Sequence, residues 1–387
     1  MKILYLHQYF ATNETGGATR SYEFSKFLSE NDHQIVVITA TNINKEFNKN
    51  FTVVSTNTNY SNHMGNFRRI LSFLSFTIKS FYKGLKIKNL DLVFATSTPL
   101  TIGLPAVLIA KIKNKPLIFE VRDVWPDVPV ELGYLKNKLL IKILKIFEPW
   151  IYNNSKHIIV LSKGMYDNLL KKGISPNKIT VIENIANLYL YNGVSDARKA
   201  EKYKDKFICI HPGTMGHVNG LDFVLDVAKF IQDHDKDILF LLIGEGKKKE
   251  YLIQRVKDEK IQNVIFDNSK PKREIAQIIK SSDLGIMCVD NKFKILEDNS
   301  ANKFFDFLAA GLPVMVNYGG WQKEIIEEYE CGESNPDPKI MAERLIAIKN
   351  DQEKRIKMGL NSRKLAEEKY SDIIAKKKLR NIIENHK

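Results

Sequence analysis

The sequence lacks several features that would place the protein in or across a membrane. No apolar run approaches the roughly 20 residues that a transmembrane helix needs, and the run Met1–Leu6 is too short for a signal peptide. Its three cysteines, Cys209, Cys288 and Cys331, are scattered without metal-ligand spacing, which is typical of a reducing compartment. No internal repeat or low-complexity segment is present. We therefore expect a cytoplasmic protein.

Acidic residues are outnumbered by basic ones. The 45 Asp and Glu residues stand against 59 Lys and Arg, which gives a net charge of +14 and an isoelectric point near 9.3. Such an excess predicts an anionic partner, which can be a nucleic acid, a membrane surface or a phosphate-bearing substrate. Nucleic acid explains the charge less well, because the sequence has no recognised binding motif and no aromatic-rich basic strand.

Short apolar runs alternate with helical patterns along the whole chain, which is typical of parallel α/β architecture. Because 387 residues are too many for one compact core, two such domains are expected. We place a first domain at 1–188, a polar linker at 189–206, a second domain at 207–365 and a basic helical tail at 366–387. The expected strands are Lys2–Leu6, Ile35–Ala40, Leu92–Ala95, Leu117–Glu120, His157–Leu161, Ile179–Ile182, Phe207–His211, Ile238–Ile243, Val264–Asp267, Leu284–Cys288 and Val314–Val316.

The most informative stretch is a predicted helix that Asn302 opens and Gly311 closes. Lys303 and Asp306 are three residues apart, so we expect them one above the other on its exposed face. A helix N-terminus with a lysine in its first turn binds phosphate oxygens, and Asp306 can accept hydrogen bonds from sugar hydroxyls. This arrangement suits a nucleoside diphosphate. The alternative is an amphipathic helix with two solvated charges.

Polar residues also follow strands of the first domain. His7 ends the first strand, and a glycine pair, Gly16 and Gly17, precedes Arg20 in a loop where backbone N–H groups can approach an anion. The alternative is a flexible turn. Further along, a buried strand delivers Arg122 and Asp123 to its carboxyl end, where ionisable groups are costly unless they face a polar cleft or tie a loop together.

In the second domain, the strand ending at His211 leads into a loop with glycines at 213, 216 and 220. The backbone of such a loop can surround a pyrophosphate. His217 in this loop carries a charge that depends on pH, or is an ordinary loop histidine. No cluster of His, Cys, Asp or Glu has metal-ligand spacing, so no metal or cofactor is expected.

With these motifs, the sequence resembles the retaining nucleotide-sugar glycosyltransferases of family 4. Their helix carries Glu-x-Met-Ala-x-Gly-x-Pro-Val, and residues 306–314 read Asp-Phe-Leu-Ala-Ala-Gly-Leu-Pro-Val. The Asn-Lys-Phe-Phe-Asp version of the motif, together with Glu-Val-Arg-Asp-x-Trp-Pro at 120–126, resembles a bacterial branch that builds O-antigen and capsule repeats and includes N-acetylfucosamine transferases. Many other members have His-Asp where this chain has Arg122-Asp123, which leaves open whether Asp123 is a base or only orients the acceptor.

The resemblance implies the GT-B fold, two Rossmann-like domains with parallel sheets facing a central cleft and a last helix crossing back to the first domain. It implies catalytic roles for Arg122, Asp123 and Lys303, and an acceptor side near His7 and Trp125. The implied donor-binding residues are Gly16, Gly17, Arg20, Gly213, His217, Gly244, Glu245, Asn268, Ser300, Asn302, Lys303 and Asp306.

The expected reaction moves a sugar, with N-acetyl-L-fucosamine from a UDP donor as the best candidate, to a polyprenyl-diphosphate-linked saccharide in lipopolysaccharide O-antigen or capsule synthesis. One alternative is a UDP-sugar 2-epimerase of the same fold. Another is a membrane or nucleic-acid binding protein that has kept the fold and lost the activity.

Two helical patterns in the first domain are both basic and apolar. The helix expected over Phe67–Lys86 has an apolar stripe widened by Phe73, and a second basic helix is expected over Leu135–Phe147. Helices of this kind lie in the interface of anionic membranes, or pack on a domain with a solvated basic face. We expect the protein to be peripheral on the inner face of the cell membrane, with contacts from Phe67, Arg68, Arg69, Phe73, Lys79 and Lys83.

Overall fold

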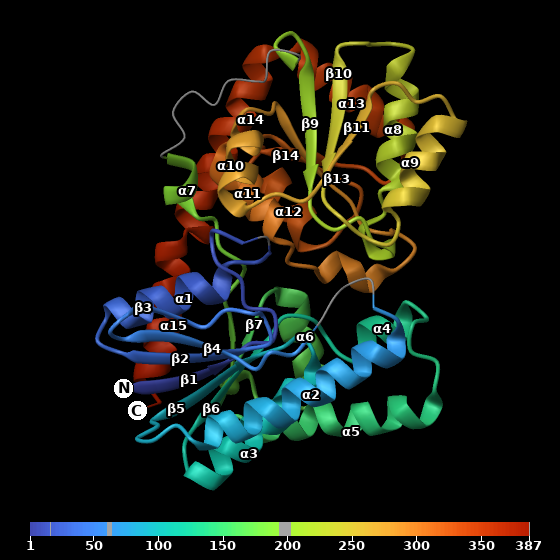
Figure 1. Ribbon diagram of the computed structural model, residues 1–387. Helices are drawn as coiled ribbons and strands as arrows, with labels where there is room; N and C mark the ends of the chain where they lie inside the picture. The colour runs from blue at the N-terminus through green and yellow to red at the C-terminus, as the bar shows by residue number, and fades with distance from the viewer. Residues whose placement is uncertain (16, 60–63, 193–202, 387) are drawn as a thin grey trace. The chain divides into compact units, whose positions relative to one another are not determined.

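The computed structural model describes residues 1–15, 17–59, 64–192 and 203–386. The chain divides into two compact units, each built around its own sheet (Figure 1). The first unit comprises Met1–Thr12, Gly17–Glu183 and Ala375–Lys387, and the second comprises Asn13–Gly16 and Asn184–Ile374. The two Rossmann-like α/β domains predicted from the sequence are therefore present.

The sheet of the first unit has the strand order β3-β4-β2-β1-β5-β6-β7-β8, and every neighbouring pair is parallel except β3 and β4. Its strands are β1 (Lys2–Leu6), β2 (Gln34–Thr39), β3 (Lys45–Asn48), β4 (Phe51–Ser55), β5 (Leu92–Thr96), β6 (Leu117–Val121), β7 (His157–Val160) and β8 (Ile179–Val181). Strands β5 and β6 are buried along their whole length, as expected for a parallel sheet covered on both faces.

The helices of this unit are α1 (Arg20–Glu30), α2 (Asn66–Leu85), η1 (Leu100–Ile102), α3 (Gly103–Lys113), α4 (Asp127–Glu131), α5 (Lys138–Asn154), α6 (Lys163–Lys171) and η2 (Pro176–Lys178). The chain returns to the unit through α15 (Asp372–Glu384). There Lys376 Nζ lies 3.4 Å from a carboxylate oxygen of Glu23 in α1.

The sheet of the second unit is parallel throughout, with the order β11-β10-β9-β12-β13-β14. Its strands are β9 (Phe207–Pro212), β10 (Ile238–Ile243), β11 (Val264–Asp267), β12 (Leu284–Met287), β13 (Val314–Val316) and β14 (Gly332–Ser334). The other elements are α7 (Leu188–Asn192), η4 (His217–Asn219), α8 (Asp222–Gln232), α9 (Lys249–Asp258), α10 (Lys272–Lys280), η5 (Lys294–Asp298), α11 (Asn302–Ala310), α12 (Trp321–Glu328), α13 (Pro338–Asn350), α14 (Gln352–Leu365) and the π-turn η6 (Ala366–Tyr370).

The structure adds elements that the sequence did not predict. Strands β3 and β14 are short edge strands, and β3 is largely exposed, so they lack the buried apolar run on which the prediction relied. Strand β4 has five residues that alternate between buried and partly buried, and the prediction missed it. The predicted linker 189–206 begins inside α7, and its residues 193–202 lie outside the described part of the chain.

The second basic helix is also displaced from its predicted start at Leu135. Helix α5 begins at Lys138, because the side chain of Asn137 caps it by accepting a hydrogen bond from the Leu140 N–H. It then continues through Pro149 to Asn154.

Candidate active site

In each sheet the strand order reverses beside the first strand, between β1 and β5 in the first unit and between β9 and β12 in the second. Open parallel sheets bind ligands outside the carboxyl ends of their strands at such a reversal. The loops that leave these strands carry most of the residues predicted to be functional. We describe the two groups separately.

The loop after β9 in the second unit is held against the loop after β10 by backbone hydrogen bonds. The N–H of Gly213 donates to the carbonyl of Ile243 over 2.8 Å, and the N–H of Met215 donates to that of Glu245 over 2.9 Å. Gly244 has φ 155°, and a Cβ there would lie 1.8 Å from the carbonyl oxygen of Gly213. Glycine is therefore required for the two loops to approach this closely.

Lys303 lies beneath this loop. Helix α11 begins at Asn302 and ends at Gly311, which has φ 72°, as predicted. The Lys303 ammonium is 2.8 Å from Nε2 of His211, and a Cβ on Gly213 would lie 3.2 Å from Cε and Nζ of Lys303. Lys303 is buried and not on an exposed helix face, which corrects the prediction, and burial lowers its pKa to about 8.

Asp306 is buried as well, and it faces a different partner. Its carboxylate lies 2.5 Å from the ammonium of Lys272 at the start of α10. Burial, together with the Asp306 carboxylate, raises the pKa of the Tyr191 hydroxyl. The predicted exposed pair is thus replaced by two buried side chains, since loops and neighbouring helices cover the face that the helical pattern left open.

The remaining predicted donor residues of this unit lie on loops near the carboxyl ends of its strands. Lys249, which the sequence analysis missed, donates hydrogen bonds to the side chains of Glu245 and Asn268, each over 2.8 Å. His217 is exposed and begins the turn η4. The carbonyl of Ser300 accepts a hydrogen bond from the Asn184 side chain over 2.5 Å.

In the first unit, Arg20 forms a fully buried ion pair with Glu120. The Arg20 Nε lies 2.8 Å from the Glu120 carboxylate, both side chains have 0% exposure, and the remaining guanidinium nitrogens donate to the carbonyls of Ile182 and Glu183. Burial alone would raise the pKa of Glu120, but Arg20 and then Arg122 outweigh it and the pKa is lowered. These contacts use three of the five N–H donors of the Arg20 guanidinium, and Glu120 already compensates its charge inside the unit. A contact of Arg20 with the donor phosphates stays a prediction.

Other predicted residues of the first unit gather near the carboxyl ends of β1, β5 and β6. Asp123 is exposed and accepts a hydrogen bond from the Thr98 hydroxyl over 2.6 Å. His7 is buried, and burial and then the charge of Arg122 lower its pKa. Trp125 packs on the core of the unit. Gly17 is exposed, and Gly16 lies outside the described residues.

The first unit also has an apolar helix surface, which we define by exposed side chains of three helices. Helix α3 contacts both α2 and α5 (Figure 1). The exposed apolar side chains of this surface are Ile70, Leu71, Leu74, Ile78, Tyr82, Leu104, Ile112, Leu139, Leu140, Ile143 and Ile146. Most of the apolar stripe of α2 thus lies in solvent, while Phe76 and the small residues Ser72, Ser80 and Gly84 are buried.

Basic side chains surround the apolar helix surface. Arg68, Lys79 and Lys83 of α2 are exposed, while Arg69 and Phe73 are half-buried. The side chain of Phe67 lies outside the described part of the structure. Helix α5 adds exposed lysines at 138, 142 and 145. An exposed patch that is both apolar and basic indicates a partner surface.

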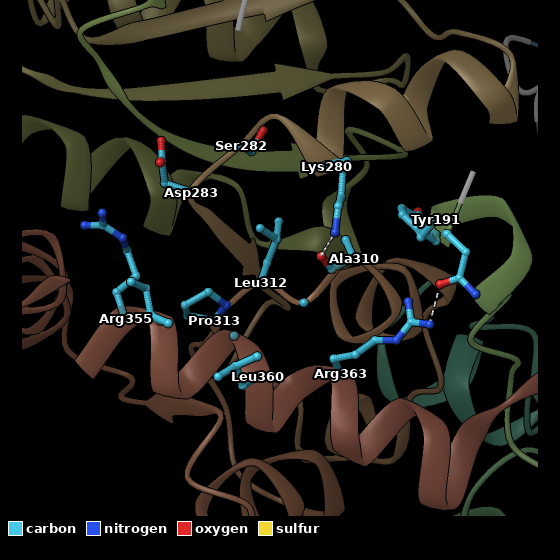
Figure 2. A pocket seen from close by; sticks show the side chains of 14 residues that line it. Tyr191, Lys280, Ser282, Asp283, Ala310, Leu312, Pro313, Arg355, Leu360 and Arg363 are labelled. Atoms are coloured by element: carbon cyan, nitrogen blue, oxygen red, sulfur yellow. Dashed lines mark hydrogen bonds between the residues drawn. The ribbon is translucent and has the colours of Figure 1, made fainter. Parts of the chain in front are cut away.

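A cavity of about 580 Å³ lies in the second unit, at the amino ends of β12 and β13 (Figure 2). Lys280 donates a hydrogen bond to the carbonyl of Ala310 there over 3.1 Å. The cavity lies at the amino ends of these strands and Lys303 does not line it, so it is separate from the group around Lys303.

Within 1–15, 17–59, 64–192 and 203–386, no three His, Cys, Asp or Glu side chains are grouped to hold a metal ion. Among the same residues, no helix is long and apolar enough to cross a membrane.

Family models match both parts of the chain. Residues 15–188 match the model described as Glycosyltransferase Family 4, and residues 195–365 match the model described as Glycosyl transferases group 1. The chain belongs to the family 4 glycosyltransferases. No curated protein is similar enough in sequence to be matched to it.

Several solved structures share the fold at low sequence identity. HepE from Anabaena, crystallised with UDP-glucose, is 14% identical with a TM-score of 0.74, and 100% of each chain is covered. WaaG, a glycosyltransferase involved in lipopolysaccharide biosynthesis, is 14% identical with a TM-score of 0.72, covering 98% of this chain and 99% of the other. Sucrose-phosphate synthase from Thermosynechococcus elongatus is 13% identical with a TM-score of 0.77, covering 99% and 98%. The predicted GT-B fold is confirmed.

The buried ion pair of this glycosyltransferase gives a stability prediction. Glu120→Gln leaves the Arg20 charge buried without a carboxylate, so we expect a loss of about 3–5 kcal/mol in the free energy of unfolding, measured by urea denaturation. The exposed pair Lys163–Asp167 provides the control, and Lys163→Ala should cost less than about 1 kcal/mol. Equal losses in the two variants would show that burial does not determine the strength of the Arg20–Glu120 pair.

Proposed function

We propose that this glycosyltransferase takes a sugar from UDP, with retention of configuration, and transfers it to a lipid-linked saccharide at a membrane surface. The observation that carries the donor half of the proposal is the Lys303 ammonium beneath the Gly213 loop. Among the described residues, no carboxylate forms an ion pair with Lys303. A buried charge without a counter-ion is costly, and a diphosphate supplies the missing charge.

The surroundings of Lys303 suit a leaving diphosphate. Its position in the first turn of α11 adds the helix N-terminus, whose free N–H groups and dipole favour anions. Fixed positive groups of this kind stabilise the charge that develops on the leaving group as the glycosidic bond breaks. His217 and Asn302 lie on the neighbouring loop and helix start, and we assign them to the same phosphates.

Asp306 is the proposed ligand of the ribose hydroxyls. Lys272 and the Tyr191 hydroxyl use part of its carboxylate, and a carboxylate has about four acceptor sites, so further hydrogen bonds remain available. The UDP-glucose bound by HepE, which has the same fold, supports a uridine nucleotide.

The first unit supplies the proposed acceptor side. Arg122 and Asp123, which follow β6, are the side chains that we assign to the reacting centre, with His7 and Trp125 near the acceptor. The resemblance of the 302–314 motif to bacterial O-antigen and capsule enzymes favours N-acetyl-L-fucosamine as the sugar and a polyprenyl-diphosphate-linked saccharide as the acceptor.

The apolar helix surface supports peripheral attachment to the inner face of the cell membrane. Exposed isoleucines and leucines beside lysines match an anionic bilayer, where the apolar side chains enter the interface and the lysines meet the headgroups. The lipid-linked acceptor is embedded in such a bilayer. Attachment would therefore hold the enzyme beside its acceptor.

Calorimetry of UDP binding tests the donor site. Lys303→Ala removes the proposed phosphate-binding charge, and we expect UDP to bind at least about 10-fold more weakly. Lys280→Ala is the control: Lys280 ends α10 beside the cavity at the amino ends of β12 and β13, so this variant should bind UDP as the wild type does. If the wild-type protein does not bind UDP, the assignment of the donor site is wrong.

The same calorimetry has an expected pH dependence. Burial lowers the pKa of Lys303 to about 8, so the ammonium is present below that pH and lost above it. UDP affinity should fall as the pH rises through about 8, and this dependence should be absent from Lys303→Ala. An affinity that increases over this range would contradict the role of the ammonium.

Chelation tests the expectation that no metal is required. Lysine and the helix N-terminus are proposed to neutralise the diphosphate, so transfer from UDP-sugar to a lipid-linked acceptor should keep its rate in EDTA. The measurement is the initial rate with and without EDTA, followed by added Mn²⁺. Loss of activity that Mn²⁺ restores would overturn this part of the proposal.

Vesicle co-sedimentation tests the membrane surface. Ile78→Glu places a charge in the apolar helix surface, and we expect roughly 10-fold weaker binding to vesicles containing phosphatidylglycerol. Ile356→Glu on α14 is a matched control, because Ile356 is 53% exposed and Ile78 is 56% exposed. Equal binding by the two variants would exclude the apolar helix surface as the contact.

A further inference from the structure

His211 is the buried side chain that contacts Lys303. It lies near the end of β9 and is fully buried. One ring nitrogen, Nδ1, lies 3.1 Å from the carbonyl of Ile286 on the adjacent strand β12, and Nε2 lies 2.8 Å from the Lys303 ammonium. Neither the proposed function nor the predicted site includes this histidine.

The chemistry of the two contacts fixes the tautomer of the imidazole. A carbonyl oxygen only accepts hydrogen bonds and an ammonium only donates them, so Nδ1 must carry the proton and Nε2 must be the acceptor. A second proton on Nε2 would point at the ammonium. The ring is therefore neutral, and burial together with the Lys303 charge lowers the pKa of His211.

Other nearby groups also leave the Lys303 charge uncompensated. The carboxylate best placed by sequence, Asp306 one turn along α11, pairs with Lys272 instead. The thiol of Cys288 after β12 is the other titratable group that acts on Lys303, and burial raises its pKa to about 12, so it is neutral at physiological pH.

We infer that His211 is a positioning residue: its neutral imidazole accepts a hydrogen bond from Lys303 and fixes the ammonium beneath Gly213 while leaving the full positive charge for the donor diphosphate. This inference rests on the proposed function and specifies how its central charge is held. A carboxylate at the same place would also hold Lys303, but it would compete with the phosphates. An apolar side chain would leave both the ammonium and the Ile286 carbonyl without this partner.

Three substitutions separate the two contacts of the imidazole. The amide of glutamine reaches about as far as Nε2, and that of asparagine about as far as Nδ1. His211→Gln can therefore accept from Lys303, His211→Asn can only donate to Ile286, and His211→Phe can do neither. We expect UDP affinity within about 3-fold of wild type for His211→Gln, and roughly 10-fold weaker binding for His211→Asn and His211→Phe, measured by calorimetry.

His234 provides a matched control in the same unit. Its Nδ1 lies 2.6 Å from the carbonyl of Phe230 in α8, and the ring is exposed. His234→Asn should bind UDP as the wild type does. Thermal melts of each variant establish that the compared proteins are folded, and if His211→Phe does not fold, the comparison of His211→Gln with His211→Asn decides.

The outcomes distinguish this inference from the proposed function. A wild type that binds no UDP overturns both. UDP binding that is lost in Lys303→Ala but kept in His211→Asn overturns the role of His211 and leaves the donor site in place. Equal weakening in His211→Gln and His211→Asn would show that the ring serves packing and not the contact with Lys303. Weakening in His211→Asn with recovery in His211→Gln supports the inference.

Discussion

The proposed donor site of the second unit depends on one buried positive charge, the ammonium of Lys303. An ammonium taken out of water is costly unless a counter-ion accompanies it, and the structure surrounds Lys303 with a neutral imidazole, a neutral thiol and the backbone of a glycine loop. The carboxylate nearest in sequence, Asp306, is paired with Lys272. Under the proposed function, an anionic ligand would remove this electrostatic cost of the unliganded protein, and that difference in free energy would favour the binding of a diphosphate.

In the first unit, by contrast, the buried cation Arg20 has a carboxylate partner. Arg20 meets a carboxylate, two backbone carbonyls and the ring of Phe24, whose centroid lies 4.4 Å from the guanidinium carbon. Its charge is fully compensated inside the unit, so its main effect is to tie α1 to β6 and to the chain after β8. Two basic residues for which the sequence predicted the same ligand therefore differ in their surroundings: a carboxylate pairs with Arg20, and among the described residues none pairs with Lys303.

The apolar helix surface shows a similar reversal. Helix α2 is amphipathic, and such a helix usually buries its apolar stripe. Here Phe76 and several small residues face the unit, and the backbone of α2 lies close to its neighbours: a Cβ on Gly84 would be 2.5 Å from Cδ1 of Ile109 in α3. This close packing leaves most of the other large apolar side chains of α2 outside, next to the lysines. Their exposure is the observation that supports the proposed membrane contact.

The sequence by itself determined the two parallel sheets, most of their strands and the 302–311 helix, because buried β-strands and amphipathic helices have local apolar periods that do not depend on distant residues. It also located polar loops that follow the strands where the strand order of each sheet reverses. Tertiary structure decided the rest. It buried Lys303 and Asp306. It also paired Arg20 with Glu120 and Asp306 with Lys272, and it brought His211 to Lys303. These three contacts join residues that are 34 to 100 positions apart. No local pattern records such partners, because an ionisable side chain is compensated or left free only by what the fold brings within a few ångströms of it.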